Sequence, residues 1–266
     1  MSGIFERLFS LRGKTALVTG AGGGIGSALA LAFAEAGATV ALNGVSPAKL
    51  QVTQSEIEKV GGKCVVLARD VSRVADCRGL IQDAQRLLGR LDILVNCAGV
   101  NRRKPVREVS EEDYDFIAGV NLKSVFFLCQ AAYPIMKAQG GGKVINIGSI
   151  TTTDGLAGVA VYGATKAAVG QLTRTLALEW AADNIQVNCL APGFMLTPLT
   201  AEGIWGDPHR KEWLTARIPL KRAGQPEELT GAALLLAGAG SSYLTGQIIN
   251  VDGGYLAGGS WLKANE

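Results

Sequence analysis

The 266-residue sequence contains a single histidine, His209, and this scarcity excludes several kinds of active site. Ser-His-Asp hydrolases need a histidine base placed by an acid, and zinc hydrolases usually hold their metal with histidines. His209 stands in the polar stretch GDPHRKE, residues 206–212, which is typical of a protein surface. The sequence therefore predicts neither class of hydrolase, and we expect no metal site.

Cysteines and long apolar runs are also scarce in the sequence. The five cysteines are an odd number with no CxxC pair, and this pattern is typical of reduced thiols in the cytoplasm. No apolar run approaches the roughly 18 residues of a membrane span, and Glu6 with Arg7 interrupts the N-terminal stretch where a signal peptide would be apolar. We expect a cytoplasmic protein with no membrane partner.

Charged residues make up 18% of the chain and give a net charge of +3 without a basic block. This distribution argues against nucleic acid as a partner. The hydrophobic fraction of 48% supplies a full core and excludes intrinsic disorder.

Seven short β-rich runs alternate with helical patterns along the whole chain. Apolar residues nearly fill these runs, as in strands buried on both faces, so the alternation predicts a parallel sheet with helices on both sides. Ser46-Pro47 and the pair Ser110 and Asp113 are helix-start signals. No linker divides residues 1–266, so we predict one α/β domain. The expected strands are 14–20, 38–43, 63–70, 91–96, 143–148, 185–190 and 247–254, and the expected helices are 24–36, 47–60, 74–88, 111–138, 162–182 and 226–238.

The first strand ends in TGAGGGIG, residues 19–26, where a helical pattern begins. Glycines here let the chain turn tightly and bring backbone N–H groups and a helix N-terminus against a pyrophosphate. An ordinary glycine-rich turn is the simpler interpretation, but the position between strand and helix favours a nucleotide. The predicted contacts are Gly20, Gly24, Ile25 and Gly26.

About twenty positions further on, dinucleotide-binding folds usually carry an acid that binds the adenosine ribose. Residues 42–46 read LNGVS and contain no carboxylate, and neither Val45 nor the glycine loop supplies an arginine for a 2′-phosphate. The missing arginine favours NAD(H), and the missing acid leaves NADP(H) open. We expect Asn43 to contact the cofactor and Asp70 with Val71 to border the adenine, although Asp70 also suits a helix cap.

Tyr162 and Lys166 are four residues apart at the start of a predicted helix, so both project from one helical face. Free tyrosine has a pKa near 10 and is a poor base, but a nearby ammonium and a positively charged nicotinamide would favour its ionised form. Such a pair is often accidental. Here Ser149 follows the fifth strand at the carboxyl end of the sheet, where ligands bind, and Asn121 lies in an apolar helix where an amide needs a partner.

Two further loops close strands at the same edge and would border a cofactor. They contribute Asn96, Ala98, Gly99, Pro192, Gly193 and Thr197.

Over essentially its whole length the chain resembles the short-chain dehydrogenase/reductase family. The matching motifs, in the family's order and spacing, are TGAGGGIG (19–26), Asp70, NCAG (96–99), Asn121, Ser149, Tyr162 with Lys166, PG…T (192–197) and VDGG (251–254). Cys97 departs from the family, which usually has a second asparagine there.

The resemblance implies a Rossmann fold with strand order 3-2-1-4-5-6-7, an NAD(P) cofactor and a homotetramer. It also implies the catalytic roles. Tyr162 would be the acid or base, Lys166 would favour the ionised phenol and hold the ribose, Ser149 would orient the carbonyl, and Asn121 would support a proton relay.

Arg102 and Arg103 follow the NCAG turn, and a predicted lid at about 198–217 contains Trp205, His209, Arg210 and Trp213. Arginine forks match carboxylates, although a solvated basic loop is the simpler interpretation. These segments resemble the sugar-acid branch of the family, the gluconate 5-dehydrogenases and 2-dehydro-3-deoxy-D-gluconate 5-dehydrogenases. We expect Arg102, Arg103, Ser149 and Tyr162 to bind a sugar acid, in carbohydrate metabolism.

Two alternatives remain open. A 3-oxoacyl-[acyl-carrier-protein] reductase would share every catalytic motif and would use basic residues to attract an acidic carrier protein. A non-catalytic NAD(P)-binding regulator is less consistent with the complete set of Ser, Tyr, Lys and Asn.

Overall fold

A parallel sheet of seven strands forms the centre of the computed structural model, which describes residues 3–259. The strand order is β3-β2-β1-β4-β5-β6-β7, as predicted. The strands are β1 (Thr15–Val18), β2 (Thr39–Gly44), β3 (Lys63–Ala68), β4 (Ile93–Asn96), β5 (Gly142–Ile147), β6 (Ile185–Pro192) and β7 (Ile248–Val251).

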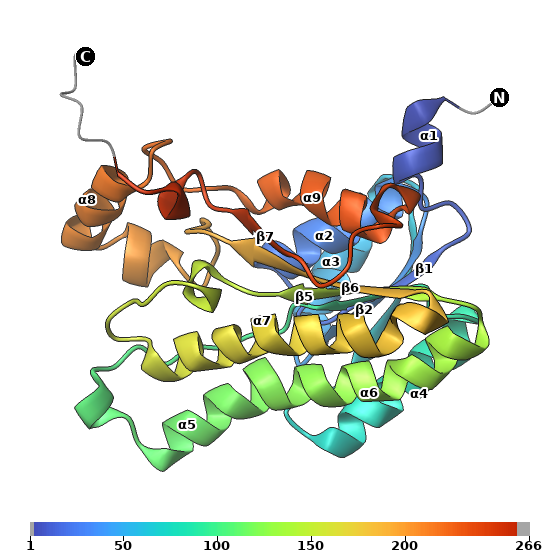
Figure 1. Cartoon of the computed structure of the whole chain (residues 1–266), viewed down its shortest axis with the longest axis horizontal. Coiled ribbons are helices and arrows are strands. Elements are labelled where there is room, and N and C mark those ends of the chain that lie inside the picture. Colours follow the sequence, from blue (N-terminus) through green and yellow to red (C-terminus); the bar gives the residue numbers. More distant parts are fainter. Residues whose placement is uncertain (1–2, 260–266) are drawn as a thin grey trace.

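Side chains of the central strands alternate between two apolar cores, one on each face of the sheet. In β1, Ala16 and Val18 enter one core and Leu17 enters the other, all without solvent exposure. Burial on both faces explains the near-continuous apolar runs in the sequence. One face is covered by α2 (Gly24–Glu35), α3 (Pro47–Lys59) and α9 (Thr230–Ala237), and the other by α4 (Val74–Leu88), α6 (Ser124–Ala138) and α7 (Ala160–Trp180), as Figure 1 shows.

Both predicted helix starts are confirmed. The Ser46 hydroxyl accepts the Lys49 N–H at the start of α3. Ser110 and Asp113 form a reciprocal capping box at the start of α5 (Glu111–Ala118). These bonds satisfy amides that the first helical turn leaves without partners.

The predicted helix 111–138 is interrupted, and the interruption lies at a predicted site residue. A π-helical turn, Gly119–Lys123, separates α5 from α6 and contains Asn121. Single π turns of this kind occur frequently at functional sites. By length and apolar composition alone, the run Glu111–Ala138 could cross a membrane, but core helices of folded proteins pass the same test, and α6 buries Leu128 and Met136 against the sheet.

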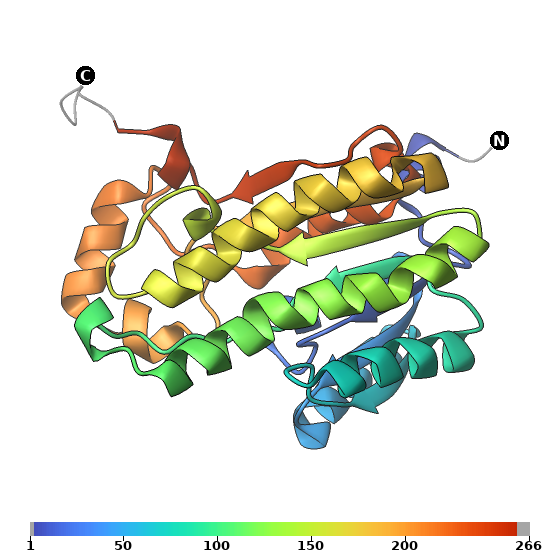
Figure 2. The ribbon, with the colours of Figure 1, turned by 60° about the horizontal axis from the view of Figure 1, so that its bottom comes forward.

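The region expected to be a lid contains two helical segments that the sequence did not predict. They are the π turn Ala201–Trp205 and α8 (Pro208–Arg217), which begins with Asp207 accepting the Arg210 N–H over 3.0 Å. Both lie at the end of the sheet where the strands terminate (Figure 2). A short α1 (Ile4–Phe9) was also not predicted.

Candidate active site

The glycine loop between β1 and α2 packs too closely for side chains at two positions. Gly20 has a φ of +68°, and a Cβ there would come within 2.9 Å of Ala98 Cα. A Cβ on Gly26 would overlap the carbonyl oxygen of Gly20. Glycine is therefore required for the loop to turn and for α2 to lie against it.

The start of α2 has the geometry of an anion cradle. Its N-cap is Gly23, which has no side chain to accept hydrogen bonds from the first-turn amides, and a Cβ added there would meet no atom within 4 Å. Thr197 lies opposite, because a Cβ on Gly24 would come within 3.5 Å of its side chain. The open space, free amides and helix N-terminus fit a pyrophosphate.

The predicted adenosine contacts fall at the ends of β2 and β3. The Asn43 amide group donates to the carbonyl oxygens of Leu67 and Arg69, at 2.9 and 3.2 Å, so its side chain joins the two strands. Asp70 is exposed and accepts the Ser72 N–H at 3.0 Å, whereas Val71 is buried. Asp70 therefore fixes a turn and does not directly cap α4, whose N-cap is Arg73.

Lys49 is a basic residue near the cofactor end that the sequence motifs did not reveal. A Cβ on Gly22 would lie 3.1 Å from Lys49 Cβ, so the first turn of α3 packs against the glycine loop. Lys49 is exposed and forms no ion pair with any residue between 3 and 259. The Ser46 cap was the available signal, since it places Lys49 in that turn.

The NCAG turn is held against the end of β1 by Thr19. The N–H groups of Cys97 and Ala98 both donate to the Thr19 hydroxyl, at 2.9 and 3.0 Å. A Cβ on Gly99 would come within 3.6 Å of Asn121 Oδ1 and 3.8 Å of Lys166 Nζ, so the turn directly adjoins the predicted catalytic residues.

The Asn96 side chain holds two neighbouring strands together. It is buried inside the sheet layer and donates to Asn146 Oδ1 at 2.8 Å and to Cys129 Sγ at 3.2 Å. Its Nδ2 group therefore ties β4 to β5, and a contact of Asn96 with the cofactor stays a prediction. Burial raises the pKa of the neighbouring Cys97 thiol to about 12, which favours its protonated form near neutral pH.

Lys166 and Tyr162 lie together on the first turns of α7. The Lys166 ammonium donates to the Ile147 carbonyl oxygen at 2.7 Å and lies 5.6 Å from the centre of the Tyr162 ring. Lys166 is only 4% exposed and has no carboxylate within ion-pair distance among the described residues. Its charge therefore lies beside the Tyr162 ring in a place with little access to solvent.

Ser149 follows β5 and begins the short helix η3 (Ile150–Thr152), which packs against α7. Its Oγ accepts the N–H of Thr151 at 3.2 Å. This hydrogen bond uses an acceptor site of the hydroxyl and leaves its own proton available for a substrate oxygen.

Asn121 connects the π turn to the loop after the NCAG motif. Its Oδ1 accepts the Val100 N–H at 2.8 Å and its Nδ2 donates to the Val100 carbonyl at 2.9 Å. The buried amide is therefore satisfied, and it fixes this loop beside Lys166.

Arg102 and Arg103, the two rim arginines that follow the NCAG turn, have different surroundings, and Arg102 does not fit the expected substrate role. Its guanidinium donates to Asp113 at 2.9 Å and to Glu112 at 3.1 Å, and it lies 4.4 Å from the centre of the Phe116 ring. These contacts hold Arg102 against α5. The sequence did not reveal them, because the box residue Asp113 was interpreted only as a helix cap.

Arg103 lies beside the segment 198–217 that is predicted to be a lid. It forms no hydrogen bond or ion pair within the described chain, and Nη1 would lie 3.9 Å from a Cβ on Gly203 in the lid. The surrounding protein lowers the pKa of its guanidinium by desolvation, the charge of Arg210 lowers it further, and Tyr162 opposes this shift. Arg103 is therefore an unpaired cation, among the described residues, within electrostatic reach of Tyr162.

The segment after β6 is supported by the closing VDGG motif. A Cβ on Gly193 would lie 2.6 Å from Asp252 Cα, so the two turns are in close contact. The Asp252 carboxylate accepts the N–H groups of Gly254 and Leu256, each at 2.9 Å, and fixes its own turn. Pro192 and Gly193 are thus held at the edge that also carries Thr197.

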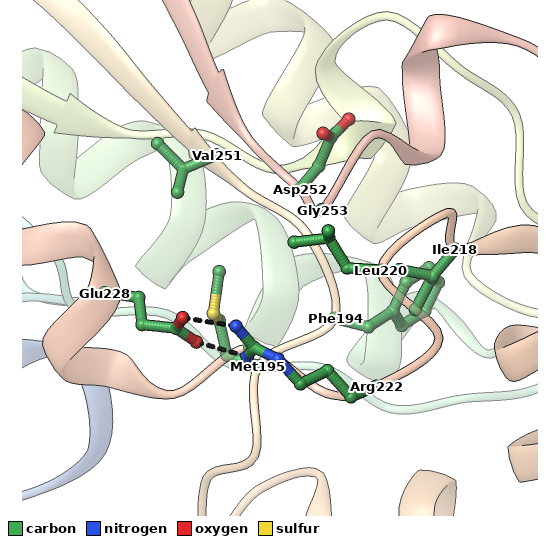
Figure 3. A pocket seen from close by; sticks show the side chains of 10 residues that line it. Phe194, Met195, Ile218, Leu220, Arg222, Glu228, Val251, Asp252 and Gly253 are labelled. Carbon is green, nitrogen blue, oxygen red and sulfur yellow. Dashed lines mark hydrogen bonds and ion pairs between the residues drawn. The ribbon is translucent and has the colours of Figure 1, made fainter.

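A separate small pocket lies beyond this segment (Figure 3). Arg222 and Glu228 form a two-point ion pair in its wall, with both distances 2.7 Å. None of the predicted site residues lines it, so it lies apart from the candidate active site. The pocket is lined by Phe194, Met195, Ile218, Leu220, Arg222, Gly224, Glu228, Val251, Asp252 and Gly253.

Comparisons with known proteins agree with this geometry. A family model described as enoyl-(acyl carrier protein) reductase matches residues 20–256. The gluconate 5-dehydrogenase of Gluconobacter oxydans is 42% identical over 93% of this chain and 96% of its own length. The 2-dehydro-3-deoxy-D-gluconate 5-dehydrogenase of Dickeya dadantii is 41% identical over 94% and 98%.

Two further similarities concern the cofactor and the alternative activity. A crystal structure of a gluconate 5-dehydrogenase from Burkholderia cenocepacia, in complex with NADP and tartrate, has a TM-score of 0.91 at 38% identity and covers 96% of this chain and 99% of that one. A 3-oxoacyl-[acyl-carrier-protein] reductase from Thermotoga maritima is 40% identical over 92% of this chain and 98% of its own. The chain belongs to the short-chain dehydrogenase/reductase family and is an NAD(P)-dependent oxidoreductase.

Proposed function

We propose that this enzyme interconverts a secondary alcohol and a ketone on a sugar acid. The observation that carries the proposal is the Arg103 guanidinium, which has no partner among residues 3–259 and whose Nη1 would lie 3.9 Å from a Cβ on Gly203, in the segment predicted to be a lid. A guanidinium can bind a carboxylate through two parallel hydrogen bonds. The names of the similar gluconate and deoxy-ketogluconate dehydrogenases, and the tartrate in a similar structure, support a carboxylate-bearing substrate.

Some of the candidate site residues would bind the cofactor, and others would transfer a proton to or from the substrate. The amides at the start of α2 would hold the pyrophosphate, and Lys166 would hold the ribose beside it. A bound nicotinamide supplies or accepts the hydride. Ser149 would donate its hydroxyl proton to the substrate oxygen, and Tyr162 would give a proton to that oxygen in reduction or take it in oxidation. Positioned proton transfer of this kind contributes typically 10²–10⁴-fold to the rate.

The structure alters the expected choice between NAD(H) and NADP(H). The expected preference for NAD(H) rested on the missing arginine, and it receives no support from similar structures that contain NADP. We infer that Lys49 and Ser46 beside the glycine loop would give a 2′-phosphate a cation and a hydroxyl. On this basis NADP(H) should be accepted at least as well as NAD(H).

One experiment separates the proposed function from its alternatives. Initial rates are measured for sugar acids, uncharged polyols and short 3-oxoacyl thioesters, each with NAD(H) and NADP(H). Turnover of aldonates or ketoaldonates supports the proposal. Activity on 3-oxoacyl thioesters alone would identify a carrier-protein reductase, and no turnover of any substrate, with intact cofactor binding, would favour a regulator.

We further propose a homotetrameric assembly in the cytoplasm. Large apolar side chains are exposed on α6, α7 and the loop before β7, namely Phe126, Leu178 and Tyr243. Exposed apolar groups of this size are frequent at subunit interfaces. All five cysteines are free, which suits a reducing compartment. Sedimentation velocity tests the assembly, and cell fractionation tests the location.

A further inference from the structure

Two guanidinium groups from distant segments converge on one residue of the lid, Gly203. Arg103 comes from the loop after the NCAG turn, and its Nη1 would lie 3.9 Å from a Cβ on Gly203. Arg210 comes from the first turn of α8 and donates to the carbonyl oxygen of Gly203. The two side chains thus approach the same short stretch of backbone.

The charges around this pair do not balance. Asp207 lies 3.7 Å from Arg210 Nε and offsets part of its charge, but no carboxylate within the described residues pairs with Arg103. Each arginine raises the free energy of the other's charged guanidinium group, since like charges repel at short range. An anion between them would relieve the repulsion and gain charge-assisted hydrogen bonds from both.

The lid that carries Arg210 is connected to the cofactor end of the site. The Trp205 indole N–H and the Thr200 hydroxyl both donate to the Met195 carbonyl oxygen, at 3.3 and 2.6 Å. Two residues after Met195, Thr197 faces Gly24 of the anion cradle, and its backbone N–H donates to Thr200 Oγ1 at 2.9 Å. A ligand that fixes Arg210 would therefore also steady Thr197 over the cofactor.

We propose that the substrate carboxylate bridges Arg103 and Arg210, so that one anion joins the loop after the NCAG turn to the lid. This rests on the proposed function, which supplies a substrate with a carboxylate, and it adds Arg210 as a specificity-determining residue. Uncharged polyols cannot make the bridge, so the lid would close productively only over an acid.

A double-mutant cycle tests the bridge with D-gluconate and D-glucitol, which differ only at C1, where one carries a carboxylate and the other a hydroxymethyl group. Arg103→Ala and Arg210→Ala should each raise KM for D-gluconate about ten- to a hundred-fold, since a charged hydrogen bond is worth about 1.5–3 kcal/mol. The KM for D-glucitol should change little. The KM for D-gluconate should rise much less in the double variant than the product of the two single fold increases, because both arginines act on one anion.

Lys211→Ala is the matched control, since it removes one positive charge from the neighbouring exposed position of α8. It should leave both KM values near wild type. The bridge would be overturned if the KM of Arg210→Ala for D-gluconate stayed within about twofold of the wild-type value. It would also be overturned if the fold increase in KM of the double variant equalled the product of the two single increases.

Calorimetric binding of D-gluconate to the enzyme with cofactor separates this inference from the proposed function. If the wild type binds D-gluconate through both arginines without oxidising it, the bridge stands and the proposed function fails. If the wild type oxidises D-gluconate and Arg210→Ala binds it equally well, the function stands and the bridge fails. If neither D-gluconate nor any other aldonate or ketoaldonate of the substrate panel binds to the wild type, both the proposed function and the bridge fail.

Discussion

The Lys166 ammonium donates to the carbonyl oxygen of Ile147 at 2.7 Å and lies 5.6 Å from the centre of the Tyr162 ring. The carbonyl at the end of β5 fixes the ammonium without neutralising it, so the positive charge remains available to the phenol and to a ribose. Tyr162, the proposed proton donor and acceptor, therefore lies beside a positive charge that no carboxylate of the described residues neutralises.

Tyr162→Phe should lower kcat by roughly 10²–10⁴-fold, because the ring still packs but no proton can be exchanged with the substrate oxygen. Cofactor binding, measured by fluorescence titration, should stay near the wild-type value. Tyr114→Phe is the matched control, since it removes a phenol from an exposed side chain of α5. A Tyr162→Phe variant that retained most of its kcat would show that another group transfers the proton.

The two rim arginines should respond differently to substitution. Arg102→Ala should lower the Tm, because it removes a partner of the buried Asp113 carboxylate. Its effect on KM should be small and similar for D-gluconate and D-glucitol, unlike the selective effect of Arg103→Ala. Thermal unfolding and initial rates for both variants measure this contrast. A selective rise in the D-gluconate KM for Arg102→Ala would restore Arg102 as a substrate ligand.

The carboxylate of Asp113 links stability to pH. Hydrogen bonds from Lys104 and Arg102, at 2.6 and 2.9 Å, and from the Ser110 N–H hold its pKa well below the usual range. A depressed pKa contributes stability that is fully present above the unfolded value near 3.9 and declines as the pH falls toward the folded value.

Asp113→Asn should therefore lower the Tm by roughly 5–10 °C at pH 7, and the difference from wild type should narrow at pH 3. Glu111→Gln is the control, because Glu111 is exposed in the same first turn and has no ion pair among residues 3–259. Differential scanning calorimetry at both pH values measures the Tm of the wild type and of the two variants. If the difference in Tm between Asp113→Asn and wild type widened at pH 3, the charge of Asp113 would not be what stabilises the start of α5.

Lys49 provides the prediction for the cofactor. Lys49→Gln should raise KM for NADPH about ten-fold and leave KM for NADH nearly unchanged, because only the former carries a 2′-phosphate. Lys59→Gln, at the exposed far end of α3, should change neither. Equal effects of Lys49→Gln on both cofactors would remove Lys49 from the phosphate site.

The strands, the helices and the individual site motifs could be predicted because they depend on local patterns, whereas the strand order was predicted only through the resemblance to the family. Continuous apolar runs, a glycine loop and the Tyr162–Lys166 spacing are each visible within a few residues. The π turn at Asn121 was not predicted, and Asn121 bonds to Val100, twenty-one positions away, a contact that no local pattern reveals. Tertiary partners likewise decided the contacts of the Asn96 side chain and of Arg102, which the sequence placed at the substrate.

The measurement that tests the central claim most directly is the ratio of kcat/KM for D-gluconate to that for D-glucitol in the wild-type enzyme with NADP⁺. The two substrates offer the same kind of secondary alcohol, and only D-gluconate carries the carboxylate that Arg103 would bind. We predict a ratio of at least about ten, corresponding to about 1.4 kcal/mol or more of preference in the transition state. A ratio near one, or a preference for D-glucitol, would contradict a sugar acid as the substrate.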